Sequence, residues 1–204
     1  MSALAALSVT PEQYLEAERE ADCKSEYFSG QIFAMAGASR RHNVLVGNLV
    51  RRLGNRLDGQ PCETYPSDMK VLVQANGLYA YPDVTVVCGE PEFLDRDGDV
   101  LLNPLLIVEV LSESTQSYDR GAKRALYQAL DSLQEYVLVS AGTPRVERFT
   151  RQDTGLWLYE SVGGLDGEIR LESLNITLPL AEVYERVTFP APPEPGITEM
   201  GGHQ

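Results

Sequence analysis

Two short acidic stretches decide the fold: Tyr81-Pro82-Asp83-Val84-Thr85-Val86-Val87 and, about 25 residues later, Leu105-Leu106-Ile107-Val108-Glu109-Val110-Leu111. Each stretch places one carboxylate in an apolar, β-branched run that is typical of a buried strand. The run around Glu109 is almost continuously apolar, which predicts a central strand buried on both faces. Buried carboxylates are costly unless a metal or a cation compensates them. Two of them on adjacent strands predict a divalent-metal site.

The sequence before these strands predicts a helix, a hairpin and a longer helix. Thr10 and the residues that follow it form a capping box with proline at the first helical position, so a helix should run to about Ala21. The apolar stretches on either side of Ser29-Gly30 predict a β-hairpin. Ser39 caps a second helix, in which a leucine recurs every fourth residue from Leu45 to Leu57.

The sequence after the first acidic strand predicts a loop, a helix and further strands. Residues 90–103 are acidic and rich in turn formers, so we expect a mobile loop there. The next helix should span Tyr118 to Leu130, with Lys123 at the margin of an apolar face formed by Ala122, Leu126, Ala129 and Leu130. A strand at 135–139 and a second hairpin over 145–161 should follow.

Length and composition fit one domain of a water-soluble protein. The chain has 204 residues, of which 43% are hydrophobic and 23% charged, and no apolar run is long enough to span a membrane. The three cysteines, Cys23, Cys62 and Cys88, show no metal-binding spacing, so we expect reduced thiols and a cytoplasmic location.

The charge distribution is uneven. The formal net charge is −13, which should weaken binding to polyanions. Residues 39–57 nevertheless carry five arginines and no acid. Such a basic helix can guide a phosphate backbone, and we take Arg41, Arg51 and Arg52 as candidate substrate-binding residues together with His42. Two alternatives stay open: a solvated helix face, and arginines that pair with the surplus acids of the chain or with a second subunit.

Asp83 and Glu109 are the candidate metal ligands. Mg²⁺ prefers hard oxygen ligands and usually keeps several waters, so one or two protein carboxylates suffice, and Mn²⁺ is an alternative ion. Lys123 is a candidate catalytic residue because an amine near a phosphate stabilises developing negative charge. The alternatives are outward-facing carboxylates at strand ends, and a surface lysine that pairs with Asp119.

Six segments in this order resemble the Uma2 family of restriction-endonuclease-like proteins, within the PD-(D/E)XK nuclease superfamily. They are residues 26–32, 35–42, 81–84, 104–112, 118–123 and 133–136. The resemblance covers roughly residues 10–187. It implies a single domain over that range, with a flexible N-terminus at 1–9 and a disordered tail at 188–204.

The resemblance implies a restriction-endonuclease-like α/β fold, in which helices flank a central mixed β-sheet that carries an N-terminal hairpin and a C-terminal β-hairpin. It also implies a magnesium site at Asp83 and Glu109, supported by Glu26 and Lys123. One position departs from the superfamily pattern: the lysine expected two residues after the acid is Leu111 here, and Lys123 on the following helix takes its place.

The expected function is magnesium-dependent hydrolysis of phosphodiester bonds, in DNA as the first choice of substrate, by a chain that is able to form a homodimer. Two alternatives stay open. The same fold can serve as a non-catalytic binding module, or as a metal-dependent hydrolase of small phosphoesters, for which the acidic net charge is less of an obstacle.

Overall fold

A six-stranded mixed sheet forms the centre of the molecule. The structure is a computed structural model that describes residues 8–112 and 115–189. The strands lie in the order β11-β10-β9-β8-β6-β3, with bounds β3 (Cys62–Pro66), β6 (Val84–Cys88), β8 (Leu106–Leu111), β9 (Glu135–Ser140), β10 (Arg145–Arg151) and β11 (Trp157–Gly163). Strands β8 and β9 are parallel, and the other neighbours are antiparallel. The two acidic stretches are therefore adjacent strands, as predicted.

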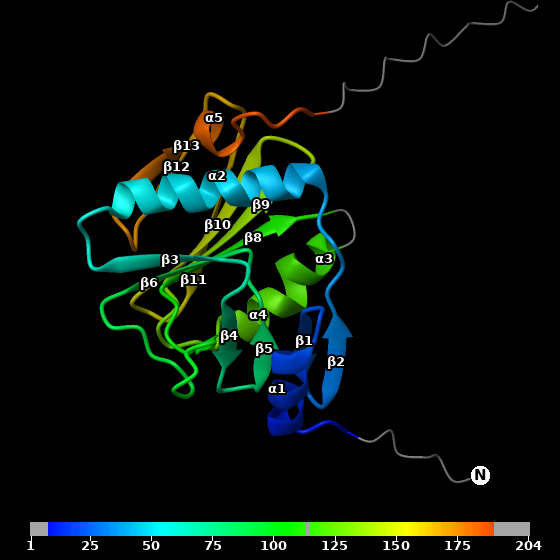
Figure 1. Ribbon diagram of the computed structural model, residues 1–204. Helices are drawn as coiled ribbons and strands as arrows, with labels where there is room; N and C mark the ends of the chain where they lie inside the picture. Colours follow the sequence, from blue (N-terminus) through cyan, green and yellow to red (C-terminus); the bar gives the residue numbers. More distant parts are fainter. Residues whose placement is uncertain (1–7, 113–114, 190–204) are drawn as a thin grey trace, which may run out of the picture.

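Helix α2 (Arg40–Leu57) lies across one face of this sheet (Figure 1). Ser39 caps it as predicted, and the stripe from Leu45 to Leu57 is at most 3% exposed. These leucines pack on the valines of β6 and β8, together with the hairpin of β12 (Glu168–Leu171) and β13 (Ile176–Pro179) and the short helix α5 (Leu180–Val183).

A five-stranded sheet and α1 complete the other side. The strands lie in the order β2-β1-β5-β4-β7, with bounds β1 (Ser25–Phe28), β2 (Gln31–Ala34), β4 (Lys70–Val73), β5 (Leu78–Ala80) and β7 (Val100–Leu101). The capping box of Thr10 opens α1 (Pro11–Glu20), and the predicted hairpin turns through Ser29 and Gly30, which both have positive φ. Tyr127 and Tyr136 join the two layers in a second core.

The helix expected over 118–130 is built differently. It consists of α3 (Gln116–Tyr118), a π-helical segment η1 (Asp119–Lys123) and α4 (Arg124–Tyr127). The expected apolar face is confirmed at Leu126 and Leu130, which pack in the second core, and is wrong at Ala122 and Ala129, which are exposed. A π-helix has wider turns than an α-helix, and the buried residues here are Asp119, Lys123 and Tyr127.

The segment 90–103 is more ordered than expected. It contains β7, which pairs with β4, and Leu94 N–H donates to the Val100 carbonyl. Arg19 on α1 forms ion pairs with Asp95, Asp97 and Asp99 over N–O distances of 2.7–3.2 Å. The acidic residues therefore hold the segment to α1 through one guanidinium group.

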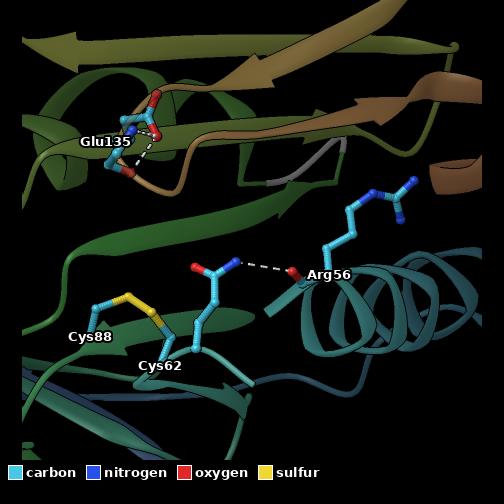
Figure 2. Close-up of a disulfide and its surroundings, with 6 residues drawn as sticks. Arg56, Cys62, Cys88 and Glu135 are labelled. Carbon is cyan, nitrogen blue, oxygen red and sulfur yellow. Dashed lines mark hydrogen bonds between the residues drawn. A yellow bond between two sulfur atoms is a disulfide. The ribbon is translucent and has the colours of Figure 1, made fainter. Parts of the chain in front are cut away.

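The expectation of three reduced thiols is wrong. Cys62 and Cys88 form a disulfide between β3 and β6, and Cys23 is free and exposed (Figure 2). The antiparallel register sets these two residues opposite each other although 26 positions separate them, so no sequence spacing revealed the pair. The argument for a cytoplasmic location loses the support of the cysteines.

The ends of the described chain are tied to the domain. Val9 N–H donates to the Gly30 carbonyl, and the Phe189 ring lies 5.5 Å from that of Tyr184. The other residues of the expected flexible N-terminus and tail, 1–7 and 190–204, lie outside the described residues. Within 8–112 and 115–189, no helix combines the length and apolar character that crossing a membrane requires.

Candidate active site

Asp83 and Glu109 lie close together at one end of two neighbouring strands. Asp83 directly precedes β6, whose Val84 is opposite Val108 of β8, and Glu109 follows Val108. The backbone N–H of Val110 donates to Asp83 Oδ2 over 2.7 Å, which fixes the Asp83 carboxylate beside the Glu109 strand.

Lys123 joins this pair to a third carboxylate. Its Nζ lies 2.9 Å from Glu109 Oε1 and 2.9 Å from Glu26 Oε1. The lysine is 6% exposed and Glu109 is 4% exposed. Lys123 is therefore a buried cation between two acids, and the alternative of a surface lysine does not hold.

Glu26 reaches the cluster from the other sheet. It lies on β1 and also accepts a 3.4 Å hydrogen bond from the Tyr81 N–H, two residues before Asp83. A lone acid in a short strand gives no strong signal in the sequence, and only the family resemblance pointed to it.

His42 is directed at Asp83. It occupies the first turn of α2, and its Nε2 is 2.9 Å from Asp83 Oδ1. Burial lowers the pKa of His42, but the hydrogen bond and the charge of Asp83 outweigh it and raise that pKa above its usual value. His42 was expected to bind substrate, and here it contacts a candidate metal ligand instead.

Two further residues complete the site, and the sequence reasoning did not select them for it. The Tyr127 hydroxyl donates to Glu109 Oε1 over 3.3 Å, and Asp119 is a buried acid within electrostatic range of Lys123. Asp119, Lys123 and Tyr127 recur every fourth residue. That spacing was visible in the sequence but less prominent than the alanine and leucine pattern beside it.

Burial dominates the electrostatics. It raises the pKa of Glu109 to about 8, although the ammonium of Lys123 opposes the change. Burial lowers the pKa of Lys123, but Glu109 and Glu26 outweigh it and hold that pKa well above its usual value. Lys123 is thus a permanent cation, and Glu109 is a group that requires positive charge beside it to stay ionised.

Known proteins resemble this chain in sequence and in structure. The model of the family described as "Uma2: Putative restriction endonuclease" matches residues 11–181. The chain belongs to the Uma2 family. Two uncharacterized proteins of Synechocystis sp. (strain PCC 6803) are 37% and 36% identical to this Uma2 chain, over 89% and 82% of its length and 94% and 95% of theirs.

A crystal structure confirms the fold. A protein of Anabaena variabilis, described as "a putative nuclease belonging to DUF820", superimposes with a TM-score of 0.69 at 17% identity, covering 86% of this chain and 97% of its own. The α/β architecture expected for a restriction-endonuclease-like protein is therefore the observed one.

Three of the five arginines of α2 pair with acids outside the carboxylate cluster in this Uma2 chain. Arg51 and Arg52 bind Glu185 over 2.5 and 2.7 Å, and Arg56 binds Glu182 over 2.8 Å. Arg51 also lies nine residues beyond His42, which is about 14 Å along a helix axis. Arg51, Arg52 and Arg56 therefore pair with surplus acids of the chain, which was one of the open alternatives.

Arg41 contacts the end of the sheet at which the site lies, because Ala141 follows Ser140, and Ser140 is paired with Leu111, two residues beyond Glu109. Its Nη1 donates to the Ala141 carbonyl over 2.9 Å, and its guanidinium lies 6.0 Å from the centre of the Phe189 ring.

The donor set fits a hydrated divalent ion. No group of three or more acidic, histidine or cysteine side chains in the described residues is placed to enclose a metal. The adjacent pair Asp83 and Glu109 instead offers hard oxygen ligands from one side. Mg²⁺ is bound in this way, through one or two carboxylates with waters or substrate oxygens at its remaining positions.

Proposed function

We propose that this chain is a magnesium-dependent endonuclease that hydrolyses phosphodiester bonds in DNA. The observation that carries the proposal is the position of Asp83 beside the Glu109 strand, with Lys123 held between Glu109 and Glu26. The description of the family as restriction endonucleases, and of the Anabaena protein as a nuclease, supports the same class of reaction.

Each residue has a role that follows from its position. Asp83 and Glu109 would hold Mg²⁺, which when bound supplies positive charge at the phosphate and acidifies a water. His42 and the Val110 N–H orient Asp83. Lys123 presents an ammonium group where negative charge develops on the phosphate. Glu26 holds Lys123 in place and can accept a hydrogen bond from a water at the edge of the site.

The test combines cleavage with metal binding. Plasmid DNA incubated with Mg²⁺ or Mn²⁺ should be nicked, and EDTA should abolish nicking. Asp83→Asn and Glu109→Gln should each reduce the rate by at least about 100-fold. Asp131→Asn changes an exposed acid away from the site and serves as the control.

Titration with Mn²⁺, followed by electron paramagnetic resonance, gives a second measurement. Binding by the native chain should be lost in Asp83→Asn and Glu109→Gln and retained in Asp131→Asn. Equal Mn²⁺ affinity in all four proteins would remove the metal site from the proposal.

A second candidate is a metal-dependent phosphodiesterase that acts on small molecules. The neutralised arginines Arg51, Arg52 and Arg56 favour it, because a small substrate needs no extended basic surface. Turnover of bis(p-nitrophenyl) phosphate with no cleavage of plasmid or oligonucleotides would select this function. A chain that binds Mn²⁺ but cleaves neither substrate would point to a binding module.

A further inference from the structure

Two exposed aromatic residues flank Glu26 at the edge of the site. Phe33 on β2 is directly opposite Glu26 in the hairpin, so the two side chains share one face of the sheet. Strand β2 is the outer strand of its sheet (Figure 1), and Phe33 is 48% exposed there. Large apolar side chains on an exposed edge strand are usually avoided, which indicates that this one serves binding.

Tyr118 lies on the segment that carries Lys123, whose amine contacts the same acid. It is 42% exposed and ends α3, five residues before Lys123, which is about one turn of a π-helix. Partial burial raises the pKa of Tyr118, and the charge of Glu26 is the next contribution, so the ring lies within electrostatic range of that carboxylate. Phe33 and Tyr118 therefore border the cluster of Glu26, Lys123 and Glu109.

The charges around the site leave little affinity for a duplex. Three acids, Glu26, Glu109 and Asp119, surround the cation Lys123, and three of the five arginines of α2 pair with Glu182 and Glu185. Arg40 and Arg41, in the first turn of α2, are the basic residues left near His42. Duplex binding depends on basic residues that neutralise closely spaced phosphates. Binding of a single strand combines contacts to phosphates with stacking of bases on aromatic rings, and stacking contributes about 1–3 kcal/mol per base.

We infer that Phe33 and Tyr118 form a stacking platform for an unpaired base, so that the substrate is single-stranded nucleic acid or a nucleotide displaced from a duplex. This inference rests on the proposed phosphodiesterase function. Bases within an intact duplex are stacked on each other and cannot stack on two rings of the protein. A strand with free bases places one base on the platform and its phosphate beside Lys123.

The test measures fluorescence anisotropy of labelled 12-nucleotide single strands and the matching duplex, in Ca²⁺ so that no cleavage occurs. The native chain should bind the single strand at least about 10-fold more tightly. Phe33→Ala and Tyr118→Ala should each weaken that binding about 5- to 100-fold, while Phe33→Tyr and Tyr118→Phe keep the ring and the affinity. Tyr159→Ala removes a similarly exposed ring, 47% exposed on β11, and should change nothing.

The outcomes separate the inference from the proposed function. Equal or tighter binding of the duplex, or unchanged affinity in both alanine variants, would overturn the platform, and plasmid cleavage in Mg²⁺ would still stand. Sedimentation tests whether a second copy of the chain covers these two rings. If the native chain is a dimer, and Phe33→Ala or Tyr118→Ala dissociates it without changing oligonucleotide affinity, this surface is a contact between two copies. No binding and no cleavage of any nucleic acid would end both proposals.

Discussion

Lys123 is the residue on which the site depends, because it is buried between two acids that would otherwise repel each other. Replacement by methionine keeps the approximate volume and removes the charge. We expect turnover to fall about 100-fold while Mn²⁺ affinity changes by no more than about threefold. The reason is that the amine stabilises negative charge that develops on the phosphate and does not bind the metal. Steady-state cleavage and Mn²⁺ titration measure the two effects separately.

The same substitution should affect stability. It leaves Glu26 and Glu109 buried without their cation, and breaking a buried ion pair costs about 3–5 kcal/mol. Urea unfolding in EDTA should show this loss. Lys24→Met, at a more exposed lysine paired with Asp68, is the control. Native activity in Lys123→Met would exclude the lysine from catalysis.

His42 acts on the site through Asp83. Groups that orient a metal ligand typically contribute 10- to 100-fold to metal affinity. We therefore expect His42→Ala to weaken Mn²⁺ binding by about that factor. His42→Gln, whose amide can still donate to Asp83, should recover most of the loss. If His42→Ala binds Mn²⁺ normally but binds oligonucleotide poorly, the histidine contacts substrate, as the sequence first suggested.

At the scale of elements, the disulfide between β3 and β6 closes a loop of 26 residues. Restricting a loop of this length in the unfolded chain stabilises a protein by about 3 kcal/mol. Reduction, or the double change Cys62→Ser and Cys88→Ser, should lower the free energy of unfolding by a similar amount. Cys23→Ser is the control, because that thiol is free. Identical unfolding curves with and without reductant would contradict the assignment.

The contact between α1 and the acidic segment 95–99 should depend on pH. The hydrogen bond from Arg19 lowers the pKa of Asp99 below 3.8, so the folded state binds its proton less tightly than the unfolded state. The stabilisation is then fully present above the unfolded pKa and is lost as the pH falls through the lower folded value.

Arg19→Ala should therefore reduce stability by up to about 1 kcal/mol at neutral pH, since the pair is partly exposed, and by much less near pH 3. Thermal unfolding at several pH values provides the measurement. Arg96→Ala, an exposed arginine in the same segment, should behave like the native chain. If the stability difference between Arg19→Ala and the native chain is the same at every pH, the ion pair does not depend on the titration of Asp99.

The sequence predicted the strands and long helices well because their signals are local. The capping box of Thr10 and the leucine repeat of α2 depend on neighbouring residues, and both were confirmed. The pairing of Cys62 with Cys88 depends on the register of two distant strands. The π-helical segment is a local deviation without a clear sequence signal, so Ala122 and Ala129 were assigned to the apolar face although they are exposed and Lys123 is buried.

The site was predicted only in part, because some of its residues have local sequence signals and others are brought in by the tertiary structure. Asp83 and Glu109 stand out as acids within apolar strands, and the structure sets them close together. Glu26 and Tyr127 come from elements whose approach to β8 only the tertiary structure shows. The arginines of α2 are evident in the sequence. Their partners Glu182 and Glu185 are more than 120 residues away, so the ion pairs could not be predicted.

For the whole molecule, these ion pairs determine how a chain of net charge −13 meets a polyanion. If Arg51, Arg52 and Arg56 stay paired with Glu182 and Glu185, the chain neutralises few phosphates when it binds a nucleic acid. A plot of log K against log salt should have a slope of about −1 to −2. The double change Arg51→Glu and Arg52→Glu should lower stability but change oligonucleotide affinity less than about twofold.

Arg40→Glu is the matched comparison, since Arg40 is exposed in the same turn of α2 as His42 and should contribute to affinity. Anisotropy in Ca²⁺ at several salt concentrations measures all three proteins. A slope near −4 that Arg51→Glu and Arg52→Glu reduce by half would show instead that these arginines leave their acids for the phosphate backbone.

The burial of Lys123 also determines how this protein can be labelled. The chain has three lysines, of which Lys70 is 2% and Lys123 6% exposed, whereas the side chain of Lys24 is 37% exposed. Acylating reagents require a free amine in contact with solvent, so Lys24 is the one accessible lysine target in the folded domain. Coupling of a dye or a sensor surface through lysine therefore selects a single attachment point and leaves the amine of the site unmodified.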